Sequence, residues 1–128
     1  MIPERFAPMT YGAFRIVFGL LFFMFGLQKL LGWFGGPVAP LASLMGAAGV
    51  IETVCGFLIM VGLFTRYAAF LACGEMAVAY FYIHWRLMGA TPLVNMGERS
   101  TMFCFAFLYI CSRGAGIWSI DGAVSSKR

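Results

Sequence analysis

Four long apolar segments, separated by short stretches rich in glycine, proline or charge, dominate the chain. They cover residues 10–31, 44–64, 67–86 and 97–113. A helix rises about 1.5 Å per residue, so about 20 residues cross a hydrocarbon layer about 30 Å thick. The last segment is short, and we expect it to extend beyond these bounds or to lie in thinned bilayer. The pattern predicts an all-α fold, an integral membrane four-helix bundle that forms one domain over residues 1–128.

Glycines mark one side of the first segment. Gly12, Gly19 and Gly26 recur every seven residues. At about 100° per residue they share one face, which allows another helix to approach closely. Arg15 and Lys29 fall on the same face. Because an arginine facing lipid is costly, we expect this face to point into the bundle.

The second and third segments each carry a glutamate, Glu52 and Glu75. A charge at the centre of an isolated membrane helix costs about 2.5 to 3.5 kcal/mol, so these groups should not stand unpaired. We therefore expect Arg15, Glu52 and Glu75 to form a buried charge cluster. Such a cluster either fixes the register of the helices or forms a proton or substrate site, and the sequence leaves both open.

A second group of polar and aromatic residues gathers at the predicted outer ends of the helices. Its members are Gln28, Lys29, Trp33, His84, Asn95 and Glu98. Helix ends and caps explain such residues as well as a binding site does. If this is a site, His84 and Glu98 are the catalytic candidates because both can exchange protons. Lys29, Trp33 and Asn95 would then bind a polar head group.

Composition supports a membrane protein, with 62% hydrophobic and only 11% charged residues. The net charge of +4 comes from basic residues that stand singly at the ends of apolar runs. This distribution indicates orientation in a lipid bilayer rather than binding to nucleic acid. Four spans place both termini on the same side of the membrane. The distribution of basic residues predicts that this side is the cytoplasm. The residues on that side are Arg5, Arg66, Arg113, Lys127 and Arg128.

Several familiar chemistries do not fit the sequence. The four cysteines lie within apolar segments without a C-x-x-C pair, which is typical of small buried side chains rather than of disulfide or zinc frameworks. One histidine cannot supply two imidazoles to haem, although a histidine and methionine pair stays open. There is no Glu-x-x-His spacing for a di-iron site and no phosphate-binding loop. Haem and metal are therefore not indicated.

Longer motifs extend over nearly the whole chain. They are R-I-V-F-G, F-x-F-G-L-Q-K-L, G-W-F-G-G, G-x-x-E-x-x-x-G-x-L-x-x-x-G-L-F-T-R, E-M-A-V-A-Y-F-x-x-H, N-x-G-E and G-A-G-x-W-S-x-D. As a set they resemble the DoxX family of small four-helix membrane proteins. The resemblance implies a bacterial inner-membrane protein. It marks six motif positions without assigning their roles: Arg15, Glu52, Glu75, His84, Asn95 and Glu98.

The DoxX family includes subunits of thiosulfate:quinone oxidoreductase and members associated with oxidative stress and thiol metabolism. The resemblance therefore favours a quinone-linked redox membrane subunit, with quinone as the expected cofactor. A soluble or membrane redox protein, or further copies of the chain, are the expected partners. The alternative is a non-enzymatic carrier of a small solute, or an assembly partner of a redox or stress-response complex. The residues leave this choice and the substrate open.

Overall fold

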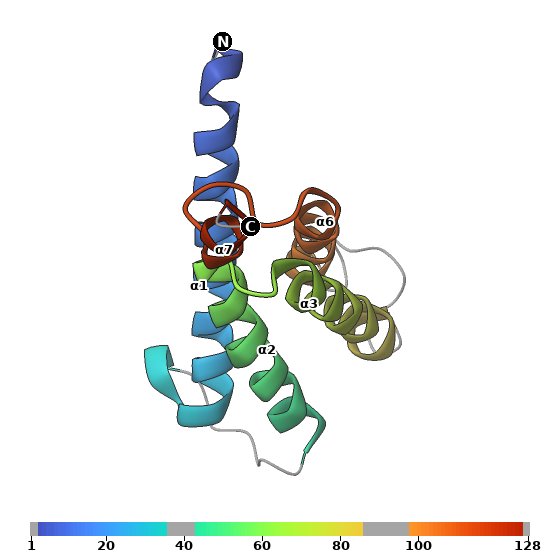
Figure 1. Ribbon diagram of the computed structural model, residues 1–128. Helices are drawn as coiled ribbons and strands as arrows, with labels where there is room; N and C mark the ends of the chain where they lie inside the picture. Colours follow the sequence, from blue (N-terminus) through green and yellow to red (C-terminus); the bar gives the residue numbers. More distant parts are fainter. Residues whose placement is uncertain (1–2, 36–42, 86–97, 127–128) are drawn as a thin grey trace.

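The computed structural model describes residues 3–35, 43–85 and 98–126, and Figure 1 shows their arrangement. All regular structure in these ranges is helical. The α-helices are α1 (Ala7–Leu31), α2 (Leu44–Val61), α3 (Thr65–Ala79), α6 (Glu98–Arg113) and the short α7 (Ile120–Ser126). Short 3₁₀ turns occupy Glu4–Phe6 and Trp33–Gly35, and a π-helical segment, Tyr80–Trp85, continues α3.

The long helices associate in two pairs. Helix α1 packs along α2, α3 packs along α6, and α2 and α3 join the pairs (Figure 1). Helix α7 crosses α1 where α2 turns into α3, and the Asp121 amide donates a 2.8 Å hydrogen bond to the Gly62 carbonyl. The predicted all-α four-helix bundle is confirmed.

Glycines permit the close approach of α1 and α2. A Cβ atom built on Gly19 would lie 2.5 Å from the Met60 amide nitrogen, and one built on Gly56 would lie 2.9 Å from the Gly19 carbonyl oxygen. Neither position has room for a side chain without moving backbone. Gly19 and Gly26 of the predicted glycine face therefore form its contact with α2, whereas Gly12 packs against Trp118.

Aromatic side chains fill the space between the pairs. Phe22 and Phe107 are fully buried, with ring centroids 4.6 Å apart, and Phe103 packs against both. Other large apolar side chains face outward, such as Phe70 and Phe105 at 72% and 64% exposure. An apolar exterior is expected where lipid is the solvent. Among the described residues, Glu4–Leu31 and Leu44–Val61 are the helical stretches long and apolar enough to cross a bilayer.

The connection between α2 and α3 differs in detail from the prediction. The second helix ends at Val61 rather than residue 64, because Gly62 adopts a left-handed conformation with φ of 75° and caps it. Phe64 also has a positive φ, 51°, and α3 begins at Thr65. Helix α7 was not predicted. Its seven residues contain too few apolar positions to show a helical period.

Candidate functional site

A cavity of about 170 Å³ lies between the four long helices. Each helix contributes a polar group to its wall: Lys29 from α1, Glu52 from α2, Glu75 from α3, and Arg99 with Ser100 from α6. Phenylalanine, methionine and alanine side chains form the rest of the wall. We refer to this space as the charged cavity. It combines acidic, basic and hydroxyl groups inside an otherwise apolar bundle.

An ion pair between Lys29 and Glu52 crosses the charged cavity. The Lys29 ammonium lies 2.7 Å from Oε1 and 2.7 Å from Oε2 of Glu52, and the Oε1 contact is also a hydrogen bond. The Glu52 side chain is 3% exposed and that of Lys29 is 20% exposed. A carboxylate buried this deeply needs a partner, and Lys29 supplies it. Arg99 lies at the rim, with its guanidinium carbon 4.3 Å from the centroid of the Phe25 ring.

Among the described residues, Glu75 is the cavity carboxyl that has no ion-pair partner, whereas Glu52 is paired with Lys29. Its Oε2 atom is buried and has no hydrogen-bond partner among the described residues. Buried polar atoms are nearly always paired, so such an atom calls for an explanation. A ligand with a hydrogen-bonding group is one. Glu75 also sits beside Glu52, whose charge Lys29 already compensates.

An apolar groove of about 390 Å³ adjoins the charged cavity between α2 and α3. Exposed side chains line it, among them Phe70, Leu71 and Val78, so the groove opens on the outer surface of the bundle. The groove and the charged cavity share four wall residues: Met45, Ala48, Glu75 and Ala79. An apolar path thus leads from the lipid-facing side to the unsatisfied carboxylate.

The predicted cluster of Arg15 with Glu52 and Glu75 is wrong. Arg15 is fully buried, but it donates to backbone carbonyls: Nε to Ile59 at 3.2 Å, Nη1 to Ala115 at 2.6 Å and Ile117 at 3.1 Å, and Nη2 to Trp118 at 2.7 Å. Fourteen residues separate Arg15 from Lys29, which is about 21 Å along a helix. Arg15 therefore anchors the segment that follows α6. The two glutamates of the charged cavity lie toward the opposite end of the bundle.

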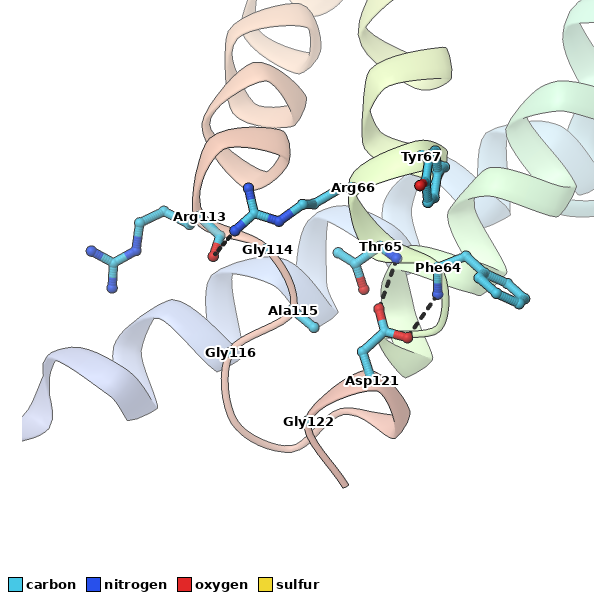
Figure 2. A pocket seen from close by; sticks show the side chains of 10 residues that line it. All are labelled: Phe64, Thr65, Arg66, Tyr67, Arg113, Gly114, Ala115, Gly116, Asp121 and Gly122. Carbon is cyan, nitrogen blue, oxygen red and sulfur yellow. Dashed lines mark hydrogen bonds between the residues drawn. The ribbon is translucent and has the colours of Figure 1, made fainter. Parts of the chain in front are cut away.

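The end of the bundle that Arg15 anchors holds a second pocket, of about 350 Å³, shown in Figure 2. Asp121 accepts hydrogen bonds from the amides of Phe64 (3.0 Å) and Thr65 (2.9 Å), which cap the start of α3. Burial disfavours the Asp121 charge, but these bonds outweigh it and lower the pKa of the carboxyl. Arg66 donates to carbonyls at the end of α6, at Cys111 and Ser112. The polar side chains of this pocket thus hold helix ends together, and we assign the pocket a structural role.

The predicted outer group is only partly brought together. Lys29 lines the charged cavity, whereas Trp33 is 53% exposed and Glu98 is exposed at the start of α6, and neither lines it. The His84 side chain and the whole of Asn95 lie outside the described residues. The catalytic roles of His84 and Glu98 stay predictions. Sequence reasoning missed Arg99 and Ser100, although both follow Glu98 directly.

The fold and the charged cavity define a helical membrane protein with an amphipathic interior site. The DoxX family model matches residues 12–85, and the chain belongs to this family. It is 36% identical to an uncharacterised protein of Haemophilus influenzae, over 97% of each chain. It is 30% identical to the inner membrane protein YphA of Escherichia coli, over 84% of each.

A further relative is an uncharacterised membrane protein of Mycobacterium tuberculosis, which is 26% identical over 94% of this chain and 84% of its own length. No solved structure matches the chain. The family membership confirms the resemblance inferred from the motifs. Family membership identifies a membrane protein but assigns no activity, so the chemistry has to be inferred from the site.

Proposed function

We propose that this protein is a quinone-linked redox subunit of the bacterial inner membrane, and that the charged cavity binds the head group of an isoprenoid quinone. One observation carries the proposal: an apolar groove on the outside of the bundle shares Glu75 with a cavity that also holds Lys29 and Glu52. A lipid-borne molecule with a polar head and an apolar tail has this shape and polarity.

The cavity residues fit such a head group. Quinone carbonyl oxygens accept hydrogen bonds, and the ammonium of Lys29, the hydroxyl of Ser100 and the guanidinium of Arg99 can donate them. The apolar walls of the α2–α3 groove suit an isoprenoid tail, because few polar groups there would have to lose water. The ion pair with Glu52 holds the Lys29 ammonium at the cavity and compensates its positive charge.

Reduction of a quinone to a quinol takes up two electrons and two protons. Glu75 is placed to pass protons, because its carboxyl lies at the meeting point of groove and cavity and has an unpaired buried oxygen. Lys29 would orient the carbonyl and stabilise charge that develops on it. A soluble or membrane redox partner, or a second copy of the chain, would exchange the electrons.

Placement in the inner membrane follows the name of the Escherichia coli relative. We infer that both termini face the cytoplasm, from the distribution of basic residues. The structured connection near Arg15 and Asp121 would then lie at the cytoplasmic end, and the charged cavity nearer the outer end. A carboxyl-terminal reporter that is active only outside the cytoplasm would contradict this orientation.

The proposal is tested on protein purified in a mild detergent. Its lipid extract and absorption spectrum should reveal a bound quinone, and a short-chain benzoquinone should bind the stripped protein. Glu75→Gln should lower turnover with a redox partner about 10²-fold, the scale of a lost acid or base. Glu4→Gln is the matched control, because Glu4 is an exposed carboxylate that lines neither the groove nor the cavity. If the extract contains no quinone and the added benzoquinone does not bind, the carrier or assembly role is favoured instead.

A further inference from the structure

Two of the four cysteines meet between α3 and α6. The Cys73 and Cys104 sulfur atoms lie 3.6 Å apart, in contact as free thiols. Thirty-one positions separate them along the chain, and they come from two helices that pack side by side. Cys55 and Cys111 are also free. The pairing was not predicted, because the spacing of these cysteines along the chain forms no recognisable motif.

The thiol pair lies next to the charged cavity. Cys73 is one helical turn from Met76 on α3, and Cys104 is one turn from Ser100 on α6. Met76 and Ser100 both line the cavity. Residues three or four apart share a helix face, so the pair forms the next layer of the same α3–α6 contact. A ligand in the cavity would lie about one helical turn away, roughly 5 Å along the axis.

We propose that Cys73 and Cys104 are a redox-active dithiol that reduces the quinone bound in the charged cavity. This inference rests on the proposed function and supplies the electron donor within the chain. Two S–H bonds break and one S–S bond forms between the helices. The two electrons and two protons released convert the quinone to its quinol. A thiol reductant in the partner protein or solution then restores the dithiol.

The geometry allows this step with small movements. A disulfide is about 2.05 Å long, so the sulfur atoms must approach by about 1.5 Å, which side-chain rotation and a slight shift of α3 against α6 can supply. Both side chains are partly buried rather than locked in the core. Because α3 carries Glu75 and α6 carries Arg99, the disulfide would also tie together two walls of the cavity.

The experiment uses the full chain in lipid nanodiscs, reduced, freed of reductant and kept anaerobic. A short-chain benzoquinone with one isoprene unit is added, and quinol is followed by absorbance. Free thiols are counted by alkylation and mass spectrometry, and linked peptides are mapped. We expect one quinol per chain, loss of two thiols and a Cys73–Cys104 linked peptide. Cys73→Ser and Cys104→Ser should each abolish quinol formation.

Cys111→Ser is the matched control, because Cys111 lies on α6 seven residues beyond Cys104 and is also partly buried. This variant should react as the wild type does. Quinone binding that leaves all thiols free would overturn the dithiol step and leave the proposed quinone site standing. Failure of the quinone to bind at all would overturn the proposed function, and the dithiol step with it.

Discussion

Lys29 on α1 and Glu52 on α2 form an ion pair in which both carboxylate oxygens lie 2.7 Å from the ammonium nitrogen. Glu52 is nearly inaccessible, so removal of Lys29 would leave a buried charge without a partner. We expect Lys29→Met to cost about 3 to 5 kcal/mol in the free energy of unfolding, the range for breaking a buried pair. Unfolding in mixed micelles with increasing denaturing detergent measures it.

A double-mutant cycle is the control for this prediction. Glu52→Gln combined with Lys29→Met removes both charges, and the double variant should recover most of the lost stability. Additive losses in the double variant would show that the two residues act independently, and the ion pair would then have no energetic role.

Sequence reasoning found the helices and their contact faces but not the partners of the charges. Glycines seven residues apart predicted the face of α1 that meets α2, because helical periodicity is local. Which carboxylate meets which cation depends on how far along the bundle each lies and how far its side chain reaches. Lys29 was expected among the polar residues at the outer ends of the helices, and its partner Glu52 was expected to meet Arg15.

Arg15 shows the other limit of sequence reasoning. Three of its four acceptors are carbonyls about one hundred residues away, in the segment before α7. Backbone carbonyls cannot be recognised in a pattern of side chains. A buried arginine in a sequence therefore predicts a carboxylate partner, even where the acceptors are carbonyls. Glu52, which was expected to pair with Arg15, pairs with Lys29 instead.

Arg15→Lys should weaken the attachment of this segment while keeping the charge. One ammonium cannot reach carbonyls that the guanidinium contacts through three nitrogen atoms. Hydrogen bonds from charged donors contribute about 1.5 to 3 kcal/mol each, so we expect a loss of at least about 2 kcal/mol. Unfolding of the two proteins in detergent measures the loss. The exposed Arg5→Lys is the control, and equal stability of both variants would contradict the anchoring role.

Gly56→Ala should force α1 and α2 apart, because the added Cβ would collide with the Phe23 backbone and lie 2.9 Å from the Gly19 carbonyl oxygen. We expect a loss of about 1 to 3 kcal/mol, as for an overpacked core. Gly74→Ala is the matched control, since its Cβ would meet nothing within 4 Å. Alanine favours helix at both sites, so thermal shifts of opposite sign are diagnostic. A Gly56→Ala protein as stable as the wild type would disprove the close contact.

Asp121 should make stability depend on acid. Its pKa is lowered in the folded protein by the Phe64 and Thr65 amides. The unfolded chain therefore binds the proton more readily, with a pKa of about 3.9. The stabilisation is complete above that value and is lost as pH falls through the lower folded pKa. Unfolding measured from neutral pH down to strong acid should show this slope reduced in Asp121→Asn. Parallel profiles would show that the carboxylate does not couple to folding.

The groove between α2 and α3 makes a prediction about the tail of the ligand. Gly74 lines the groove, and a side chain added there points into open space. Gly74→Leu should therefore fold normally and fill the groove without touching the charged cavity, which Gly74 does not line. We expect it to weaken binding of a quinone with a long isoprenoid tail about tenfold or more, because several apolar contacts, each burying one CH₂ worth about 0.8 kcal/mol, are lost. Binding of a tail-free benzoquinone should be unchanged, and titration of both ligands in detergent compares them. Equal weakening of both would place the head group in the groove, and no weakening of either would place the tail elsewhere.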